Sequence, residues 1–422
     1  MSKLLILIVI ILGAVAIALL MRTYELGKKL SNRKEEEISE KDNNLASKLF
    51  ILFMIAFFGS FIYLMITYGR CLPPAASEHG KAIDWLLDIN FIIIITVFFL
   101  TNTLLFVFAR VYRRKKGVKA YYYPHNNKLE MIWTVVPAVV LAFIIIFGLK
   151  TWNDITSASP KEAIHVELFS EQFKWTARYS GDDNVLGGHD YKLTTDQNQL
   201  GLVTTATLDS AIRLMEYGTD DGSVLGIKLM EQKLNDKNLM MIPKDREKLE
   251  TDLDRKTRLL RLLYQMKGRH DASKDKFAYD DVIETDTLHL IVNKNYEMTF
   301  RAKDVIHSAY FPHFRVQMNT VPGLTTRFKF KPVYTTAEMR KIKKDDNFNY
   351  VLMCNKICGS AHYKMKMMVV VQTQEEFDTW MKTKKTFGST FLVQEKGTDT
   401  SSDPLTSGKP IEVADTIVLI NK

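Results

Sequence analysis

The sequence predicts an α+β membrane protein, with transmembrane helices in its first third followed by a β-rich domain that carries a helical insertion. Long uncharged apolar runs all fall within the first 150 residues of the 422-residue chain. From Lys161 onward the pattern changes to short alternating segments typical of strands, interrupted by one charged segment with helical spacing. We therefore expect a membrane domain at 1–152 with about four transmembrane helices, and an exterior domain at 153–422.

The membrane domain is predicted from four apolar runs, at 4–21, 49–69, 89–109 and 131–149. Each is at least 18 residues long, about the length that a helix needs to cross a hydrocarbon core of roughly 30 Å. The first run could instead be a signal peptide, but no clear small-residue cleavage pattern follows it, so we expect a retained helix. These runs predict a multi-pass protein in contact with membrane lipid.

Basic residues in the loops predict on which side of the membrane the exterior domain lies. The first and third loops are rich in Lys and Arg, whereas the second has only Arg70 and Lys81. By the positive-inside rule the first and third loops are cytoplasmic, which puts the C-terminal domain outside. The net charge of +9 therefore belongs largely to topology. Since no nucleic-acid motif is present, we expect no nucleic-acid partner.

The exterior domain is predicted to be a sandwich or barrel of short strands. Its strand candidates lie at 163–169, 288–292, 296–300, 326–330, 350–353 and 367–372. Between about 180 and 286 lies an insertion with an amphipathic helix at 243–268, bounded by Pro243 and Gly268. Either this helix packs on the strands or it offers a docking surface to a partner. After about 398 a polar tail ends in one more strand candidate at 416–420.

The segment CNKICGSAHYKM at 354–365 gathers potential metal ligands. Cys354 and Cys358, two of the three cysteines in the chain, lie here with His362 and Met365. Strand-like segments precede and follow them, so we expect a loop between two strands rather than a helix. Thiolate, imidazole and thioether groups together suit copper. Two thiolates, where a mononuclear site needs one, suggest a pair of bridged ions with a backbone carbonyl completing the set.

Two further histidines and two other chemistries have to be weighed against this interpretation. His307, within DVIHSAYFPHF, is the upstream histidine that such a copper site needs, and His313 ranks second. Zinc could be held by two cysteines and two histidines, but it would leave Met365 without a role. In an oxidising exterior the two cysteines could instead form a disulfide. The third cysteine, Cys71, is expected to be an incidental thiol.

Three ordered motifs resemble cytochrome c oxidase subunit II. Cys-x3-Cys-x3-His-x2-Met, with DVIHS and VPG before it, resembles the copper A domain of that family. Glu130-x-x-Trp133-Thr134-x-x-Pro137 opens the fourth apolar run, as in the last transmembrane helix of the family. QFKW at 172–175, followed by Tyr179, resembles its aromatic stretch. The resemblance covers about 89–176 and 287–371.

The resemblance implies a cupredoxin-like barrel held outside the membrane, in a bacterial heme–copper terminal oxidase. A binuclear copper centre would accept electrons from cytochrome c and pass them to heme in subunit I, where oxygen is reduced to water and protons are translocated. Glu130 matches a glutamate at the cytoplasmic mouth of a proton pathway, although a helix-end charge could stand there without that role. By position, the copper ligands would be His307, Cys354, the backbone carbonyl of Lys356, Cys358, His362 and Met365.

The implied partners are oxidase subunit I, other oxidase subunits, and cytochrome c or a cytochrome-bearing quinol-oxidising complex. The chain has no Cys-x-x-Cys-His motif, so no heme is bound covalently to it. The implied location is the bacterial inner membrane, with the C-terminal domain in the periplasm. A quinol oxidase subunit would lack the copper ligands, and nitrous oxide reductase would be soluble with a large propeller. A membrane-anchored zinc- or copper-binding protein without an oxidase role is the alternative, and it leaves the motif at Glu130 unexplained.

Two positions depart from the family pattern. Lys356 stands where the family usually has a glutamate whose side chain helps to bind magnesium or manganese, so we expect that metal to be absent or bound differently. Phe173 replaces the tryptophan usually taken as the point of electron entry. Entry could persist through Phe173 or through Trp175, although Trp175 could equally be a core aromatic residue.

Overall fold

The computed structural model describes residues 2–30, 39–69 and 72–398. It divides into two compact units: Met1–Leu72 with Leu86–Ile146, and Pro73–Trp85 with Phe147–Lys422. Cys71, the polar tail after 398 and the strand candidate at 416–420 lie outside the described residues.

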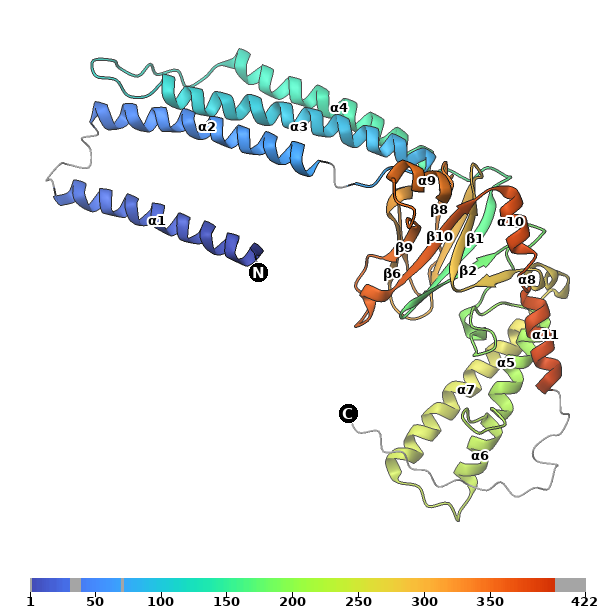
Figure 1. Ribbon diagram of the computed structural model, residues 1–422. Helices are drawn as coiled ribbons and strands as arrows, with labels where there is room; N and C mark the ends of the chain where they lie inside the picture. The colour runs from blue at the N-terminus through green and yellow to red at the C-terminus, as the bar shows by residue number, and fades with distance from the viewer. Residues whose placement is uncertain (1, 31–38, 70–71, 399–422) are drawn as a thin grey trace. The chain divides into compact units, whose positions relative to one another are not determined.

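The first unit is built from long helices, drawn in Figure 1 in blue to green: α1 (Ser2–Leu30), α2 (Glu40–Tyr68), α3 (Glu78–Val111) and α4 (Asn127–Thr156). By length and composition, α2, α3 and α4 can each cross a membrane, which confirms the last three predicted spans. The run at 4–21 lies in α1, part of whose side chains are outside the described residues. A fourth membrane span therefore stays a prediction.

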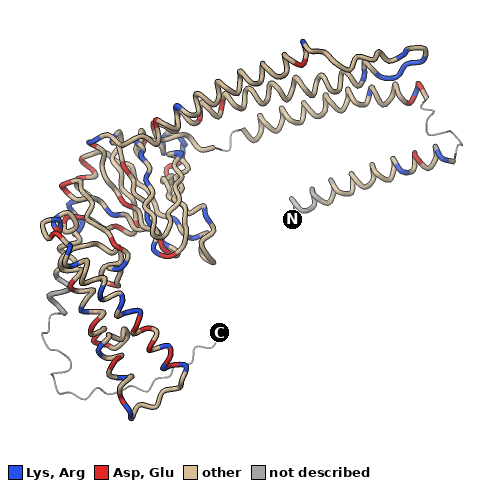
Figure 2. The backbone as a smooth tube through the Cα atoms, turned by 180° about the vertical axis from the view of Figure 1, so that it is seen from behind, with Lys and Arg blue, Asp and Glu red and all other residues tan. Residues whose placement is uncertain are grey.

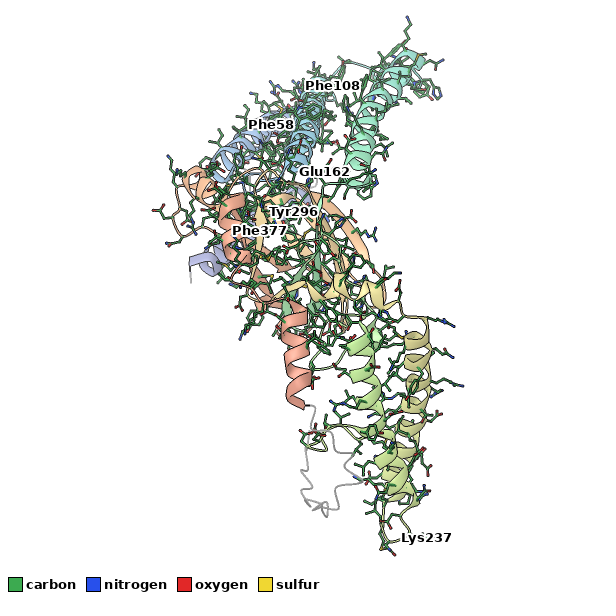
Figure 3. The ribbon with its side chains drawn as sticks, turned by 90° about the vertical axis from the view of Figure 1, so that its right-hand side faces the viewer. Phe58, Phe108, Glu162, Lys237, Tyr296 and Phe377 are labelled. Atoms are coloured by element: carbon green, nitrogen blue, oxygen red, sulfur yellow. The ribbon has the colours of Figure 1, made fainter. Side chains whose placement is uncertain are left out.

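Apolar side chains cover the middle of these helices, and charged residues on α2, α3 and α4 lie toward the helix ends (Figure 2). Phenylalanines join α2 to α3: the rings of Phe58 and Phe99 lie 4.5 Å apart, and those of Phe61 and Phe98 lie 5.1 Å apart. Phe58 on α2 and Phe108 on α3 are labelled in Figure 3. Lipid is as apolar as these rings, so the hydrophobic effect does not drive the helices together in a membrane. These contacts stabilise the helix pair through van der Waals packing instead.

The exterior part is a pair of five-stranded sheets, with strand orders β3-β2-β1-β5-β8 and β4-β10-β9-β6-β7 (Figure 1). The largest fully buried side chains include Trp175, Tyr296, Phe300 and Tyr350, which fill a common core. This architecture confirms the predicted α+β class. The strands are β1 (Ile164–Glu171), β2 (Lys174–Tyr179), β3 (Val282–Glu284), β4 (Thr287–Ile291), β5 (Tyr296–Ala302), β6 (His307–Phe311), β7 (Val316–Thr320), β8 (Thr326–Phe330), β9 (Tyr350–Cys354) and β10 (Lys366–Gln372).

Six of these strands coincide with the strand candidates, whereas β2, β3, β6 and β7 were not expected as strands. β3 has only three residues, and polar residues occupy buried positions in β2 and β6, among them Arg178, His307 and Ser308. The clearest case is β2, where Arg178 occupies a position that is only 1% exposed. Burial of a charged side chain hides the alternation on which a strand prediction depends.

The insertion lies between β2 and β3 and projects from the sheets as a helical arm (Figure 1). Its longest helix begins at Pro243, as predicted, and packs through Leu263 against Leu208 and Ile212 of the first helix of the arm. Further helices follow the strands later in the chain. The helices are α5 (Thr205–Tyr217), α6 (Ile227–Asn235), α7 (Pro243–Arg269) and α8 (Lys276–Tyr279) in the arm, then α9 (Thr336–Lys343), α10 (Gln374–Met381) and α11 (Phe387–Thr398).

A buried ionic cluster of Glu167, Arg178 and Asp281 ties the ends of the insertion to the first sheet. Arg178 donates to Glu167 on β1, and through Nη1 to Asp281 at 2.7 Å and to the carbonyl of Gly187 at 2.9 Å. The side chains are at most 1% exposed. Burial raises the pKa of Asp281 to about 7, even though the guanidinium of Arg178 favours its charged form.

Candidate metal centre

Neighbouring strands of the second sheet carry the predicted ligands. His307 opens β6, Cys354 closes β9, and Met365 immediately precedes β10. In the sheet β9 lies between β10 and β6, and its antiparallel register pairs Cys354 with Ala309. Antiparallel neighbours bring the start of one strand beside the end of the next. The start of β6, the end of β9 and the start of β10 therefore meet at one edge.

Cys354 is the first centre of contacts in this cluster. Its Sγ atom lies 3.9 Å from Nδ1 of His307 and 3.9 Å from Sγ of Cys358. The carbonyl oxygen of Lys356 lies 3.2 Å from the same sulfur. Among the described residues, the ligand atoms of His307, Cys354 and Cys358 all fall within 4.8 Å of one another. This spacing leaves room for a metal ion to bind between them.

Cys358 is the second centre of contacts and lies next to the two remaining predicted ligands, His362 and Met365. Its Sγ atom lies 3.5 Å from Nδ1 of His362 and 3.8 Å from Sδ of Met365. A short 3-10 helix, His362–Lys364, returns the loop toward β10 and places both side chains on the cysteine side. The segment is a loop between strands, as expected. Each predicted ligand thus lies next to one of two sulfurs, and each sulfur has its own histidine.

The orientation of His307 leaves the correct ring nitrogen free for a metal. Its Nε2 atom lies 2.9 Å from Oδ1 of Asp304. An ionised carboxylate only accepts hydrogen bonds, so Nε2 carries the proton and the lone pair of Nδ1 faces Cys354. A carboxylate behind a histidine ligand commonly fixes its tautomer and orientation in this way.

Burial favours the protonated form of the Cys358 thiol when no metal is bound. Cys354, Cys358 and Met365 are between 2% and 8% exposed, and His307 is fully buried. Burial, followed by the nearby Cys354, raises the pKa of the Cys358 thiol to about 11. Because a metal binds the thiolate, binding must release the thiol protons, so we expect metal loading to weaken as the pH falls.

His313, the second-ranked histidine, lies at the other end of β6 and outside this cluster. Its ring packs against Phe348 and Tyr350, with ring centroids 4.9 Å and 5.5 Å away. Burial lowers the pKa of His313 to about 4. The sheet therefore separates the two histidines that the sequence left in competition.

The aromatic residues proposed for electron entry both lie beside the cluster. The ring of Trp175 meets that of His307 edge to face, with centroids 6.3 Å apart, and Trp175 is 1% exposed. Phe173 is half-buried and its ring lies against Gly359 in the ligand loop. Phe173 is thus the more accessible of the two, whereas Trp175 belongs to the core.

The donor set fits copper better than it fits a disulfide or zinc. Both cysteines are free, and their sulfurs lie 3.9 Å apart, far beyond the roughly 2 Å of a disulfide bond. Two thiols, two imidazole nitrogens, a thioether and a carbonyl form a soft, mixed set that copper accepts in both of its oxidation states. Zinc would need only four of these donors and would leave the Met365 sulfur unused.

Comparisons with known proteins show which family the chain is similar to. Residues 62–151 match the family model described as the transmembrane domain of cytochrome c oxidase subunit II. The alternative cytochrome c oxidase subunit 2 of Bradyrhizobium diazoefficiens is 27% identical over 337 residues, which cover 77% of this chain and 91% of that protein. Cytochrome c oxidase subunit 2 of Thermostichus vulcanus is 25% identical over 313 residues, 73% of this chain and 77% of that protein. The resemblance to cytochrome c oxidase subunit II is confirmed.

The homologues of the chain are subunits of cytochrome c oxidase, which confirms the expectation of an oxidoreductase subunit. Three of the described helices are able to cross a membrane, and the matched residues include all of α3 and most of α4. The chain is thus a membrane-anchored protein with a β-rich domain of two five-stranded sheets. Among solved structures, the periplasmic domain of subunit II of cytochrome oxidase from Bradyrhizobium japonicum is 15% identical, with a TM-score of 0.25. That match covers 54% of this chain and 96% of that domain.

Lys356 and Glu130 are two positions that the resemblance to subunit II singles out. Lys356 is exposed, while its carbonyl oxygen turns toward Cys354. This carbonyl is therefore available as a ligand, although a lysine side chain stands at this position. Glu130 lies in the first turn of α4, where a carboxylate favours the positive end of the helix dipole.

Sequence reasoning missed two residues that join the ligand segments, Asp304 and Gln172. The backbone N–H of Gln172 donates to Oδ2 of Asp304 at 2.7 Å, and its side-chain amide donates to the carbonyl of Cys358 at 2.5 Å. Both residues lie inside motifs that the sequence had singled out, DVIHS and QFKW. A motif marks such residues as candidates, but only the contact between β1–β2 and the ligand loop assigns them a role.

Gly359 is predicted to be irreplaceable by alanine. Its φ is +143°, and an added Cβ would lie 2.7 Å from Nε2 of Gln172 and 2.9 Å from Cζ of Phe173. Because strain of this kind costs about 1–3 kcal/mol, we expect Gly359→Ala to weaken metal affinity roughly tenfold. Copper retained per chain in competition with a chelator measures the effect.

The matched control for this prediction is Gly188→Ala. The added Cβ at Gly188 would meet Val203 at 3.6 Å, an ordinary van der Waals distance, and the backbone there needs no positive φ. This variant should retain copper like the unaltered chain. Equal copper affinity in both variants would contradict the close fit of the loop beneath Phe173.

Proposed function

We propose that this chain is the electron-entry subunit of a respiratory terminal oxidase. In this proposal a binuclear copper centre accepts electrons from cytochrome c, or from a cytochrome-bearing quinol-oxidising complex, and passes them to heme in subunit I. Oxygen is reduced to water there, coupled to proton translocation. The observation that carries the proposal is the cluster itself, in which two cysteine sulfurs 3.9 Å apart each have a histidine beside them.

The ligand residues are proposed to act as a rigid holder. Cys354 and Cys358 would hold the two copper ions, which when bound would supply one-electron transfer. His307, His362, Met365 and the carbonyl of Lys356 would complete the set. Asp304 orients the ring of His307, and Gln172 ties the ligand loop to the first sheet. Ligands held on strands and by such hydrogen bonds change position little, which keeps the reorganisation cost of electron transfer low.

The proposed route for electrons passes beside Phe173, with Trp175 as the alternative. Phe173 lies over Gly359 at the edge of the cluster and is partly accessible, which favours it as the entry point. Glu130 is proposed to serve the entry of a proton pathway. Its place in the first turn of α4, at the end that loop charges put in the cytoplasm, supports that role.

The proposal also covers the membrane location of the protein and the magnesium or manganese ion expected near Lys356 in the family. We place the protein in a bacterial inner membrane, with the copper domain in the periplasm and subunit I with other oxidase subunits as neighbours. The excess of Lys and Arg in the first and third loops supports this orientation. Magnesium or manganese next to Lys356 is expected to be absent or bound by other groups, which elemental analysis of the purified complex can check.

Metal content and electron paramagnetic resonance of the purified oxidase test the proposed function. We expect two copper ions per copy of this chain beyond those of subunit I, and a mixed-valence signal with seven hyperfine lines. One copper with a four-line signal would indicate a mononuclear site instead. Stoichiometric zinc, or a protein that purifies without an oxidase, would favour the membrane-anchored metal-binding alternative and overturn the proposal.

A further inference from the structure

The ligand loop carries a surface of uncompensated positive charge. Residues 354–366 include Lys356, Lys364 and Lys366 and not one carboxylate. All three lysines are exposed, and none forms an ion pair with any residue that the structure describes. The Nζ atom of Lys364 lies 5.7 Å from the centroid of the Tyr363 ring. The loop is therefore free to attract a negative partner.

Neighbouring carboxylates do not cancel this charge. Glu171, next to Gln172, is already shared by Lys174 at 2.6 Å and by Lys303 at 2.9 Å. Asp304 accepts hydrogen bonds from His307 and from the backbone of Gln172. Each of the segments 171–175 and 303–307 holds one lysine and one carboxylate, so neither has a carboxylate in excess to offset the three lysines of the ligand loop. Counter-charge for the loop has to come from outside the described chain.

Apolar residues lie among these lysines. Ile357 is 87% exposed and Tyr363 is 77% exposed, although both are adjacent in sequence to buried or half-buried ligands. An exposed aromatic and an exposed branched aliphatic residue bordered by charge have the composition of a protein interface, with an apolar centre and a polar rim. We call Lys356, Ile357, Tyr363, Lys364 and Lys366 the lysine surface.

We propose that the lysine surface docks the electron donor, and that this donor presents an acidic patch over its own redox group. The inference rests on the proposed function, because an electron donor must bring its redox group close to the metal ligands. The lysine surface belongs to the loop that holds Cys354 and Cys358, so a protein docked there is as near to them as the fold permits. Complementary charge also raises the rate of encounter, from about 10⁵–10⁶ to as much as 10⁸ M⁻¹s⁻¹ at low salt.

The charge on the helical arm is of a different kind. On α7, exposed basic and acidic residues pair within the helix, as Arg246 does with Glu250 at 3.0 Å and Arg258 with Asp254 at 2.8 Å. Such pairs give a surface without one dominant sign. Lys237, before α7 at the far end of the arm (Figure 3), offers a lysine remote from the ligand loop for comparison.

The test compares two soluble one-heme cytochromes c of similar reduction potential, one basic and one acidic, as donors to the purified oxidase containing the full chain. Stopped-flow mixing measures the rate at which each reduces the copper centre, across a range of ionic strength. We expect the acidic cytochrome to react faster at low salt and to slow as salt rises, and the basic one to show the opposite trend. A faster reaction with the basic cytochrome at low salt would overturn the inference.

Variants that replace lysine by glutamate then test whether the acidic cytochrome docks at the ligand loop. Lys364→Glu combined with Lys366→Glu should slow the acidic cytochrome roughly tenfold at low salt, whereas Lys237→Glu should leave its rate within about twofold. Equal effects of the double variant and Lys237→Glu would refute docking at the loop. If the double variant folds and retains copper but no longer purifies with subunit I, the lysine surface faces that subunit and the inference fails.

The copper signal, recorded on each preparation before mixing, separates the two levels of the proposal. Absence of the binuclear signal in the unaltered oxidase would overturn the proposed function and the docking inference with it. A normal signal with donor rates that ignore the charge of the cytochrome would overturn the docking inference alone. The salt dependence of the unaltered oxidase needs no variant, so the inference remains testable if charge reversal prevents folding.

Discussion

Replacement of Cys354 by serine is expected to abolish the proposed binuclear copper centre. Its sulfur lies near Nδ1 of His307, the carbonyl of Lys356 and the sulfur of Cys358, so it contacts more of the ligand set than a terminal ligand would. A serine hydroxyl is a hard, protonated donor that cannot bridge soft metal ions at neutral pH. We expect copper to fall from two ions per chain to one or none, and the seven-line signal to disappear.

Oxidase turnover should fall with the metal. Loss of a residue that merely supports a ligand typically costs 10–100-fold in metal affinity or activity, so loss of a bridging ligand should cost at least about 100-fold. Copper analysis, the paramagnetic signal and oxygen consumption with a reduced cytochrome c measure the three effects. Ser360→Ala is the control, because Ser360 is an exposed residue of the same loop. A Cys354→Ser oxidase with an unchanged seven-line signal would contradict the proposed ligand set.

Replacement of Arg178 by methionine is expected to cause the largest loss of stability in the exterior domain. It would leave the carboxylates of Glu167 and Asp281 buried without their shared cation. Breaking a buried ion pair by removing one partner costs about 3–5 kcal/mol, which for a domain of this size lowers Tm by roughly 10 °C. Thermal unfolding of the full chain in detergent, followed by the fluorescence of buried Trp175, measures the shift.

The loss should also grow with pH. Burial already raises the pKa of Asp281 from 3.8 to about 7, and removal of the Arg178 charge would raise it further. The folded state then holds a proton that the unfolded state has released, so stability falls as the pH rises through this range. Arg178→Met should therefore be less stable at pH 8 than at pH 6, relative to the unaltered chain.

An exposed ion pair supplies the contrast for this prediction. Arg246 and Glu250 on α7 are 53% and 54% exposed, and solvent screens their attraction. Arg246→Met should change the free energy of unfolding by no more than about 0.5 kcal/mol. If Arg178→Met were as mild as this control, the buried cluster would not be what joins the insertion to the sheet.

Much of the fold could be predicted because the signals were local. The spans at 49–69, 89–109 and 131–149 depend only on length and absence of charge, and the helix at 243–268 is marked at its ends by Pro243 and Gly268. Strands with a clean apolar alternation were equally visible. β2 was missed because Arg178 is buried by an ionic partner that lies 103 residues further along the chain. No local window contains that information.

The ligand types that gather at 354–365 can be identified without a fold, since cysteine, histidine and methionine stand in one short segment. Which upstream histidine joins them depends on how the strands pair. His307 opens β6 and His313 follows just after its end. Antiparallel pairing of Ala309 with Cys354 brings the His307 end to the loop. Strand register is set by packing between distant segments, so it assigns partners that spacing along the chain leaves open.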